Sequence, residues 1–249
     1  MKKLLLFLTL ASSLFMLAGC EFNEVSQEYR DLRHAYDRMI EDEIVSTQNL
    51  ADFINHATLE TSLSNVKITV AVYENNTIIE TRYGAGVVFA SVGAHAHILT
   101  TYGLLEVTEG TNILVKVHDY LNREHMASVR VRAEEDQMGI IRIIRPLVNP
   151  LPVVTMALQL PFAGEQVLLI GFQNQVINAM SMGRILALPD DTQDLITTNV
   201  PTDIYGMGGM LVNTSHELVG IQIGVDPSTQ TVIAQPLERI LALLEQYDA

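Results

Sequence analysis

The sequence predicts a mainly β fold, in which two β-barrels follow a helical segment and precede a short terminal helix. Three observations lead to this prediction. From Asn65 onward, short runs of β-branched and apolar residues alternate with turn signals. A proline-containing stretch, residues 145–152, divides these runs into two comparable sets. Apolar residues three and four positions apart, typical of amphipathic helices, precede the first run and follow the last one.

The N-terminus has the layout of an export signal. Lys2 and Lys3 precede an apolar run, residues 4–17, that is short for a membrane-spanning helix. The run ends in Leu-Ala-Gly-Cys20, which resembles the lipobox of bacterial lipoproteins. That resemblance implies that residues 1–19 are a signal peptide and that Cys20 is lipidated. We therefore expect attachment to membrane lipid through Cys20, on the extracytoplasmic face of a bacterial cell membrane. The alternatives are an uncleaved helix and an ordinary signal peptide with an incidental cysteine.

Composition restricts the classes of partner. Cys20 is the only cysteine, so an internal disulfide is excluded. The formal net charge of −14 argues against binding to nucleic acid and against a surface patch for anionic lipid. Anchoring would then come from acyl chains, and more than one is needed for stable attachment. We expect no cofactor.

Residues 20–64 are predicted to form a lipidated N-terminus and a helical segment. Two sets of apolar residues, interrupted by the acidic residues 41–43, each lie on one helical face: Tyr29, Leu32, Tyr36 and Met39, then Leu50, Phe53, Ile54 and Ala57. The helices could pack on the rest of the chain or bind a partner. Because fewer than three clean heptads are present, packing is the preferred interpretation.

Residues 65–249 are predicted to be the β domain, with a first barrel over 65–148 and a second barrel and helix over 149–249. Asn75 and Asn76 predict a hairpin turn after the first strand. Pro236 marks a helix start, with Leu237, Ile240, Leu241 and Leu244 on one face. The predicted strands are residues 66–73, 77–83, 86–90, 98–101, 112–117, 127–132, 139–143, 166–172, 182–187, 195–199, 209–212, 218–223 and 231–234.

Several separated blocks, in the right order, resemble those of trypsin-like serine peptidases of the HtrA type. The blocks are residues 84–89 with 98–101, 136–143, 164–171, 198–211 with 217–221, and 233–236 with the helix after them. The resemblance covers about residues 66–249. It implies the trypsin-like fold, with two barrels of six strands each.

The resemblance also assigns the positions at which this family carries its chemistry. Acyl transfer requires a hydroxyl nucleophile, an imidazole base, a carboxylate and amide donors for the oxyanion. Gly103 stands at the histidine position, Gln137 at the aspartate position and Met207 at the serine position. Tyr205 replaces the glycine whose amide helps to form the oxyanion hole. The resemblance therefore implies an inactive homologue, or pseudopeptidase, that binds a peptide or protein without cleaving it.

Two alternatives remain. The first is an active peptidase with relocated residues: Asp136, one position from Gln137, with His95, His97, Ser181, Ser215 or His216. The histidine pair could also bind metal, but no third ligand lies nearby in sequence, which favours an exposed turn. The serines are better interpreted as surface residues. The second alternative is a scaffold lipoprotein that acts through helices in residues 25–63. Met180, Met182, Met207 and Met210 could form a soft peptide-binding surface or fill the core.

Overall fold

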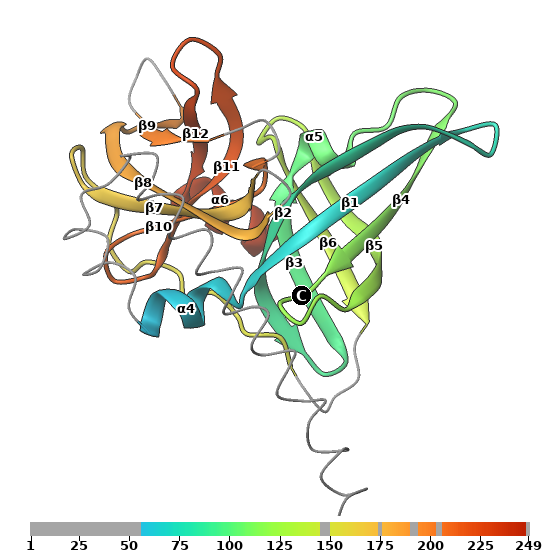
Figure 1. Cartoon of the computed structure of the whole chain (residues 1–249), viewed down its shortest axis with the longest axis horizontal. Coiled ribbons are helices and arrows are strands. Elements are labelled where there is room, and N and C mark those ends of the chain that lie inside the picture. The colour runs from blue at the N-terminus through green and yellow to red at the C-terminus, as the bar shows by residue number, and fades with distance from the viewer. Residues whose placement is uncertain (1–55, 145–149, 174–175, 190–193, 203–205, 248–249) are drawn as a thin grey trace, which may run out of the picture.

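The computed structural model describes residues 56–144, 150–173, 176–189, 194–202 and 206–247. Its strands form two closed antiparallel barrels of six strands each, which confirms the predicted fold class (Figure 1). No helix in these ranges is both long and apolar enough to span a membrane. Cys20 and most of the predicted N-terminal helical segment lie outside the described residues. The end of that segment is helix α4 (His56–Ser62).

The first barrel has the strand order β1-β2-β3-β6-β5-β4 and closes through pairing of β4 with β1. Val66, Ile68 and Val70 point inward at alternate positions and are fully buried. Asn75 and Asn76 both have positive φ, 49° and 63°, as a two-residue hairpin turn requires. The strands are β1 (Asn65–Glu74), β2 (Thr77–Val92), β3 (His95–Thr101), β4 (Thr111–His118), β5 (Glu124–Ala133) and β6 (Met138–Ile144).

The second barrel has the order β10-β11-β12-β9-β8-β7. Helix α6 (Leu237–Gln246) begins after Pro236, as predicted, and packs on β11 and β12. Its buried residues include Leu243, whereas Leu241, predicted on the apolar face, is 41% exposed. The strands are β7 (Gln166–Gln173), β8 (Val176–Ala187), β9 (Ile196–Pro201), β10 (Met210–Val212), β11 (Leu218–Asp226) and β12 (Thr231–Pro236).

The largest difference from the predicted strands is in β2. Residues 84–85 were expected to separate two strands, but β2 runs through them without interruption. The glycines in this stretch allow close packing. A Cβ at Gly86 would lie 2.7 Å from Ile98 Cγ2 and 2.8 Å from Ile68 Cδ1, closer than side chains can approach. Strand β8 also begins at Val176, six residues before its predicted start.

A shared apolar core joins the two barrels. Leu99 and Ile140 of the first barrel pack in the same buried cluster as Leu168 and Met210 of the second. Each barrel also has its own interior cluster. Because apolar burial contributes about 1.5–3 kcal/mol for each large side chain, the shared cluster holds the barrels together and fixes the residues between them.

Candidate functional site

The centre of the candidate site is the contact between β2 of the first barrel and the turn before β10 of the second. Ala85 N donates to Met207 O at 2.8 Å. Thr100 Oγ1, from β3, donates to Ala85 O at 2.7 Å. Gly208 has φ +87°, and a Cβ there would lie 2.1 Å from Ala85 O. Only glycine fits both this backbone conformation and this close approach.

The three positions assigned to the catalytic residues lie on segments that border this contact. Strand β3 leads into helix α5 (Tyr102–Leu105), and Tyr102 N donates to Gln137 O at 3.0 Å. A Cβ at Gly84 would lie 2.5 Å from Leu104 Cδ1 and 2.6 Å from Met207 O. Helix α5 therefore contacts Gln137 on one side and approaches Met207, through Gly84, on the other.

The side chains at these positions lack the groups needed for acyl transfer. Gly103 has open space around it, with no atom within 4 Å of an added Cβ. Gln137 has φ +53°, is exposed, and donates from Nε2 to Glu134 O at 2.6 Å. Met207 is partly buried and presents a thioether. Tyr205 lies outside the described residues.

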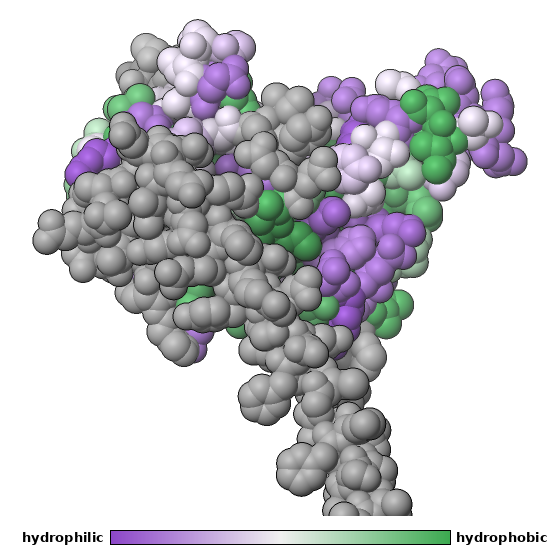
Figure 2. Space-filling view, in the orientation of Figure 1, coloured by the Kyte–Doolittle hydropathy of each residue, from purple (hydrophilic) through white to green (hydrophobic). Residues whose placement is uncertain are grey.

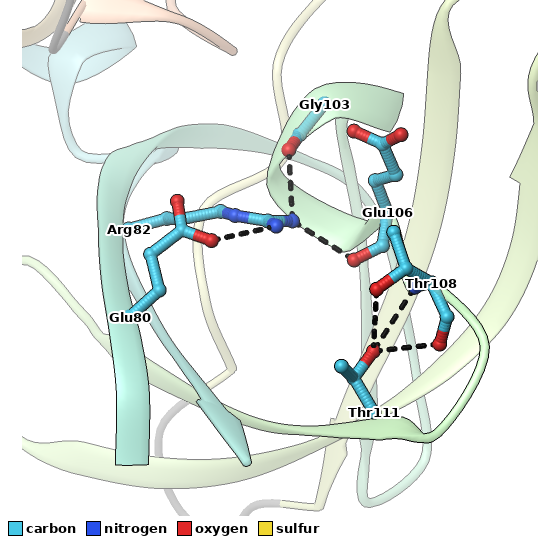
Figure 3. A network of polar contacts seen from close by, with 6 residues as sticks. All are labelled: Glu80, Arg82, Gly103, Glu106, Thr108 and Thr111. Carbon is cyan, nitrogen blue, oxygen red and sulfur yellow. Dashed lines mark hydrogen bonds and ion pairs between the residues drawn. The ribbon is translucent and has the colours of Figure 1, made fainter. Parts of the chain in front are cut away.

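Arg82 holds the segment that carries Gly103 (Figure 3). Its Nη1 donates to Glu106 O at 2.8 Å and to Gly103 O at 3.3 Å. Its Nη2 pairs with Glu80 Oε2 at 2.8 Å. The hydrogen bond from Arg82 keeps the pKa of Glu80 below its ordinary value, so this carboxylate stays charged at neutral pH. The guanidinium thus supplies hydrogen-bond donors to backbone carbonyl groups at the end of α5, because so short a helix leaves its carbonyl groups without partners inside the helix.

Comparisons with known proteins agree with this geometry. The family model of the trypsin-like peptidase domain matches residues 84–221. The chain belongs to this family. Its structure is similar to that of the serine endoprotease from Yersinia pestis, with a TM-score of 0.63 and 21% identity over 76% of this chain. The chain spans 64% of the length of that endoprotease, and the likeness shows the fold alone. No curated protein matches this chain.

Asp136, the neighbour of the family's acid position, faces the second barrel. Its Oδ1 lies 3.7 Å from Arg239 Nη1 on α6, and its carbonyl oxygen accepts from Gln235 Nε2 at 2.6 Å. Gln137, not Asp136, bonds through its carbonyl to the segment of Tyr102 and Gly103. Asp136 therefore helps to join α6 and β12 to the first barrel.

The prediction that His95 and His97 lie in an exposed turn was wrong, because both belong to strand β3. His97 is 5% exposed, and its Nδ1 lies 2.8 Å from Tyr247 Oη. Phe89 packs beside both rings. Burial lowers the pKa of His97, so its imidazole is neutral at pH 7. Among the described residues no group of three His, Cys, Asp or Glu is placed to hold a metal ion.

The serines do not meet an imidazole in the way the relocated-enzyme hypothesis requires. Ser181 was predicted at the surface but is buried in β8, where its Oγ donates to Gln173 Oε1 at 3.2 Å. Ser215 lies in an exposed turn, as expected, and its N donates to Asn213 Oδ1 at 2.9 Å. His216, at φ +64°, follows it in the same turn.

The four methionines predicted either to form a peptide-binding surface or to fill the core have different environments. Met180, Met182 and Met210 are buried in the core between the barrels, so they fill space rather than form a surface. Met207 alone is at the candidate site and partly accessible.

A buried polar cluster beside Gly206 in the second barrel was not predicted from the sequence. Gln222 is fully buried, and its Nε2 donates to Thr202 Oγ1 at 3.2 Å. Gln173 Nε2 lies 3.3 Å from the same hydroxyl. Gln222 Oε1 has no hydrogen-bond partner. A buried amide oxygen without a donor is costly, and Gln222 Oε1 lies beside Gly206, the sequence neighbour of Met207.

Proposed function

We propose that this protein is a pseudopeptidase: a trypsin-like domain that binds an extended peptide or protein segment without cleaving it. The observation that supports the proposal is the chemistry of Gly103, Gln137 and Met207, whose segments border the contact between the barrels. Glycine cannot transfer a proton, a neutral amide cannot stabilise an imidazolium, and a thioether cannot form an acyl-enzyme. The close packing that would position a triad is nevertheless retained.

Strand β11 supports the peptide-binding part of this proposal. Strand β10 pairs with β11 only as far as Ile221. From Gly224 to Asp226, the described neighbour of β11 is β12 alone. The opposite side of this strand can accept an extended chain through backbone hydrogen bonds, the usual way in which a sheet edge binds a peptide. Gly224 has open space around it, so no neighbouring side chain blocks this part of the strand.

The location of the protein is part of the proposal. The lipobox-like sequence ending at Cys20 supports anchoring of the mature chain in the outer face of a bacterial cell membrane. Acyl chains on Cys20 would hold the binding domain close to segments of other exported or membrane proteins.

A labelling experiment tests the absence of catalysis. The mature chain, residues 20–249, is incubated with casein and with a fluorophosphonate probe, and trypsin serves as the positive control. We expect neither hydrolysis nor labelling, because no serine is paired with a base at the site. Labelling of any serine, confirmed by loss in the matching Ser→Ala variant, would show that the chain is an enzyme.

Peptide capture tests the role of β11. Wild type and Gly224→Leu are compared for retention of a random peptide library displayed on phage. Gly224→Leu should fold normally, because nothing lies within 4 Å of an added Cβ, but it should reduce retention at least tenfold. Thr229→Leu, in the exposed β11–β12 turn, is the matched control and should bind as wild type does. Equal retention by Gly224→Leu would contradict binding along β11.

A further inference from the structure

A cluster of cationic side chains lies on the outer face of the first barrel, far from the candidate site. Arg142 of β6 is opposite His97 of β3 and opposite Ser128 of β5. Directly opposite residues of antiparallel strands point to the same face of a sheet. His95 and Arg130 are each two positions along their strands from these residues, so they extend the same face.

These cations differ from the others in having no partner. Among the described residues, the remaining Lys and Arg side chains pair as follows: Arg82 with Glu80, Lys116 with Glu124, Arg123 with Asp119, Arg239 with Asp136, Arg132 with Leu105 O, Arg184 with Gly164 O, and Lys67 with the Phe172 ring. Within the described part of the chain, Arg130 and Arg142 have no comparable contact. Arg142 Nε and His95 Nδ1 are also buried without a hydrogen-bond partner. In a chain of net charge −14, unpaired donors gathered in one place indicate a site for an anion.

The electrostatic surroundings of His97 agree with this interpretation. After burial, the groups that lower its pKa are Arg142, His95 and Arg130. The acidic residues of this barrel that form ion pairs, Glu80, Asp119, Glu124 and Asp136, do so with cations elsewhere. Within the described part of the chain, none of these four acidic residues pairs with Arg130 or Arg142.

Exposed apolar side chains border the cations. Val92 and Ile144 are the partners of His95 on the two neighbouring strands, and they are 56% and 68% exposed. Met126, at the start of β5, is 53% exposed. Figure 2 shows hydrophobic residues at the surface where these strands end. A row of apolar side chains next to a row of cations is the arrangement of a surface that lies on an anionic bilayer.

We infer that Arg130, Arg142 and His95 bind the phosphate group of an anionic phospholipid, while Val92, Ile144 and Met126 enter the interfacial layer. The net charge led us to expect no such patch, but the charge is unevenly distributed: between residues 150 and 247 the only Lys or Arg residues are Arg184 and Arg239. The inference is independent of peptide binding, because it uses the opposite ends of β3 and β6, about 20 Å from Gly103.

Vesicle sedimentation tests the inference. The mature chain without its lipid is mixed with vesicles of phosphatidylglycerol and phosphatidylcholine, or of phosphatidylcholine alone. We expect binding only to the anionic vesicles and weaker binding as salt is raised. Arg130→Gln and Arg142→Gln should each reduce the partition coefficient about fivefold, equivalent to ~1 kcal/mol for each basic residue at the surface. Arg142→Lys should restore much of the binding.

Arg184→Gln is the matched control, because it changes the net charge equally on the second barrel. An equal loss in Arg184→Gln would overturn the inference, as would unchanged binding in both Arg130→Gln and Arg142→Gln. Arg130 is exposed, so Arg130→Gln should fold even if Arg142→Gln does not. Inorganic phosphate is titrated separately by calorimetry. Binding of free phosphate without binding to anionic vesicles would refute the phospholipid as the source of the phosphate group.

Discussion

Replacing Gly208 by Ala should separate the two barrels where they pack most closely. The added Cβ would lie 2.1 Å from Ala85 O and 2.7 Å from Thr100 Oγ1, and the left-handed φ of +87° disfavours any side chain. The backbone conformation costs about 1–2 kcal/mol, and overpacking adds about 1–3 kcal/mol. Displacement of β2 weakens the bond from Ala85 N to Met207 O, worth roughly 1 kcal/mol. Together these contributions predict a loss of about 3–6 kcal/mol.

Urea denaturation monitored by circular dichroism measures this loss, and Tm should fall by about 10 °C for a domain of this size. Gly224→Ala is the control, because its Cβ meets nothing within 4 Å and its φ is not left-handed. Gly224→Ala should unfold within about 1 kcal/mol of wild type. If Gly208→Ala also unfolds within 1 kcal/mol of wild type, the contact between the barrels is looser than described, and the argument for a rigid site fails.

Two further predictions concern buried ionisable groups of the first barrel. Asp119 is fully buried, and hydrogen bonds from His125 and Arg123 outweigh burial and lower its pKa. Its contribution to stability is therefore complete above about pH 4 and lost as pH falls through the folded-state pKa. Asp119→Ala should lower the free energy of unfolding by about 3–5 kcal/mol at pH 7, and Asp119→Asn should lower it less. A loss under 1 kcal/mol for Asp119→Ala would contradict this account. Burial lowers the pKa of His97, so its protonation opposes folding and stability should fall as pH drops below about 6.5. The denaturant midpoint of His97→Gln should fall less between pH 7 and 5 than that of wild type. An equal fall in the two proteins would show that His97 does not titrate in this range.

Strand periodicity predicted the barrels because each strand carries its own alternating pattern. β1 is an example, with Val66, Ile68 and Val70 on the buried side. The pattern failed where tertiary contact determines the residue type. Gly84 lay in a predicted break between two strands, but glycine is needed there inside β2 because Leu104 and Met207 O occupy the space of a side chain. The four-residue helix α5 was missed because it is too short to show periodicity.

The site was predictable to a different extent. The positions of Gly103, Gln137 and Met207 were assigned from ordered motifs, and their segments border the contact between the barrels. The surroundings of individual side chains could not be predicted from these motifs. His97 was expected in a turn because no further metal ligand lies nearby in sequence, but it lies in β3, where the Phe89 and Tyr247 rings pack against it. The buried polar cluster at Gln222 depends on contacts of β11 with Thr202, just after β9, and with the turn at Gly206. No local sequence pattern indicates these contacts.

The same two strands connect both proposed surfaces. β3 and β6 run from the cations at His95 and Arg142 to the ends that hold Thr101 and Met138, next to Gly103 and Gln137. If the cationic end lies on a bilayer, the candidate peptide site faces away from it, toward segments of other proteins. A lipid anchor alone would allow the domain to rotate freely on its tether, whereas a second contact on the first barrel would fix its orientation. Loss of Arg130 and Arg142 should therefore leave peptide capture in solution unchanged but reduce capture by the membrane-bound chain.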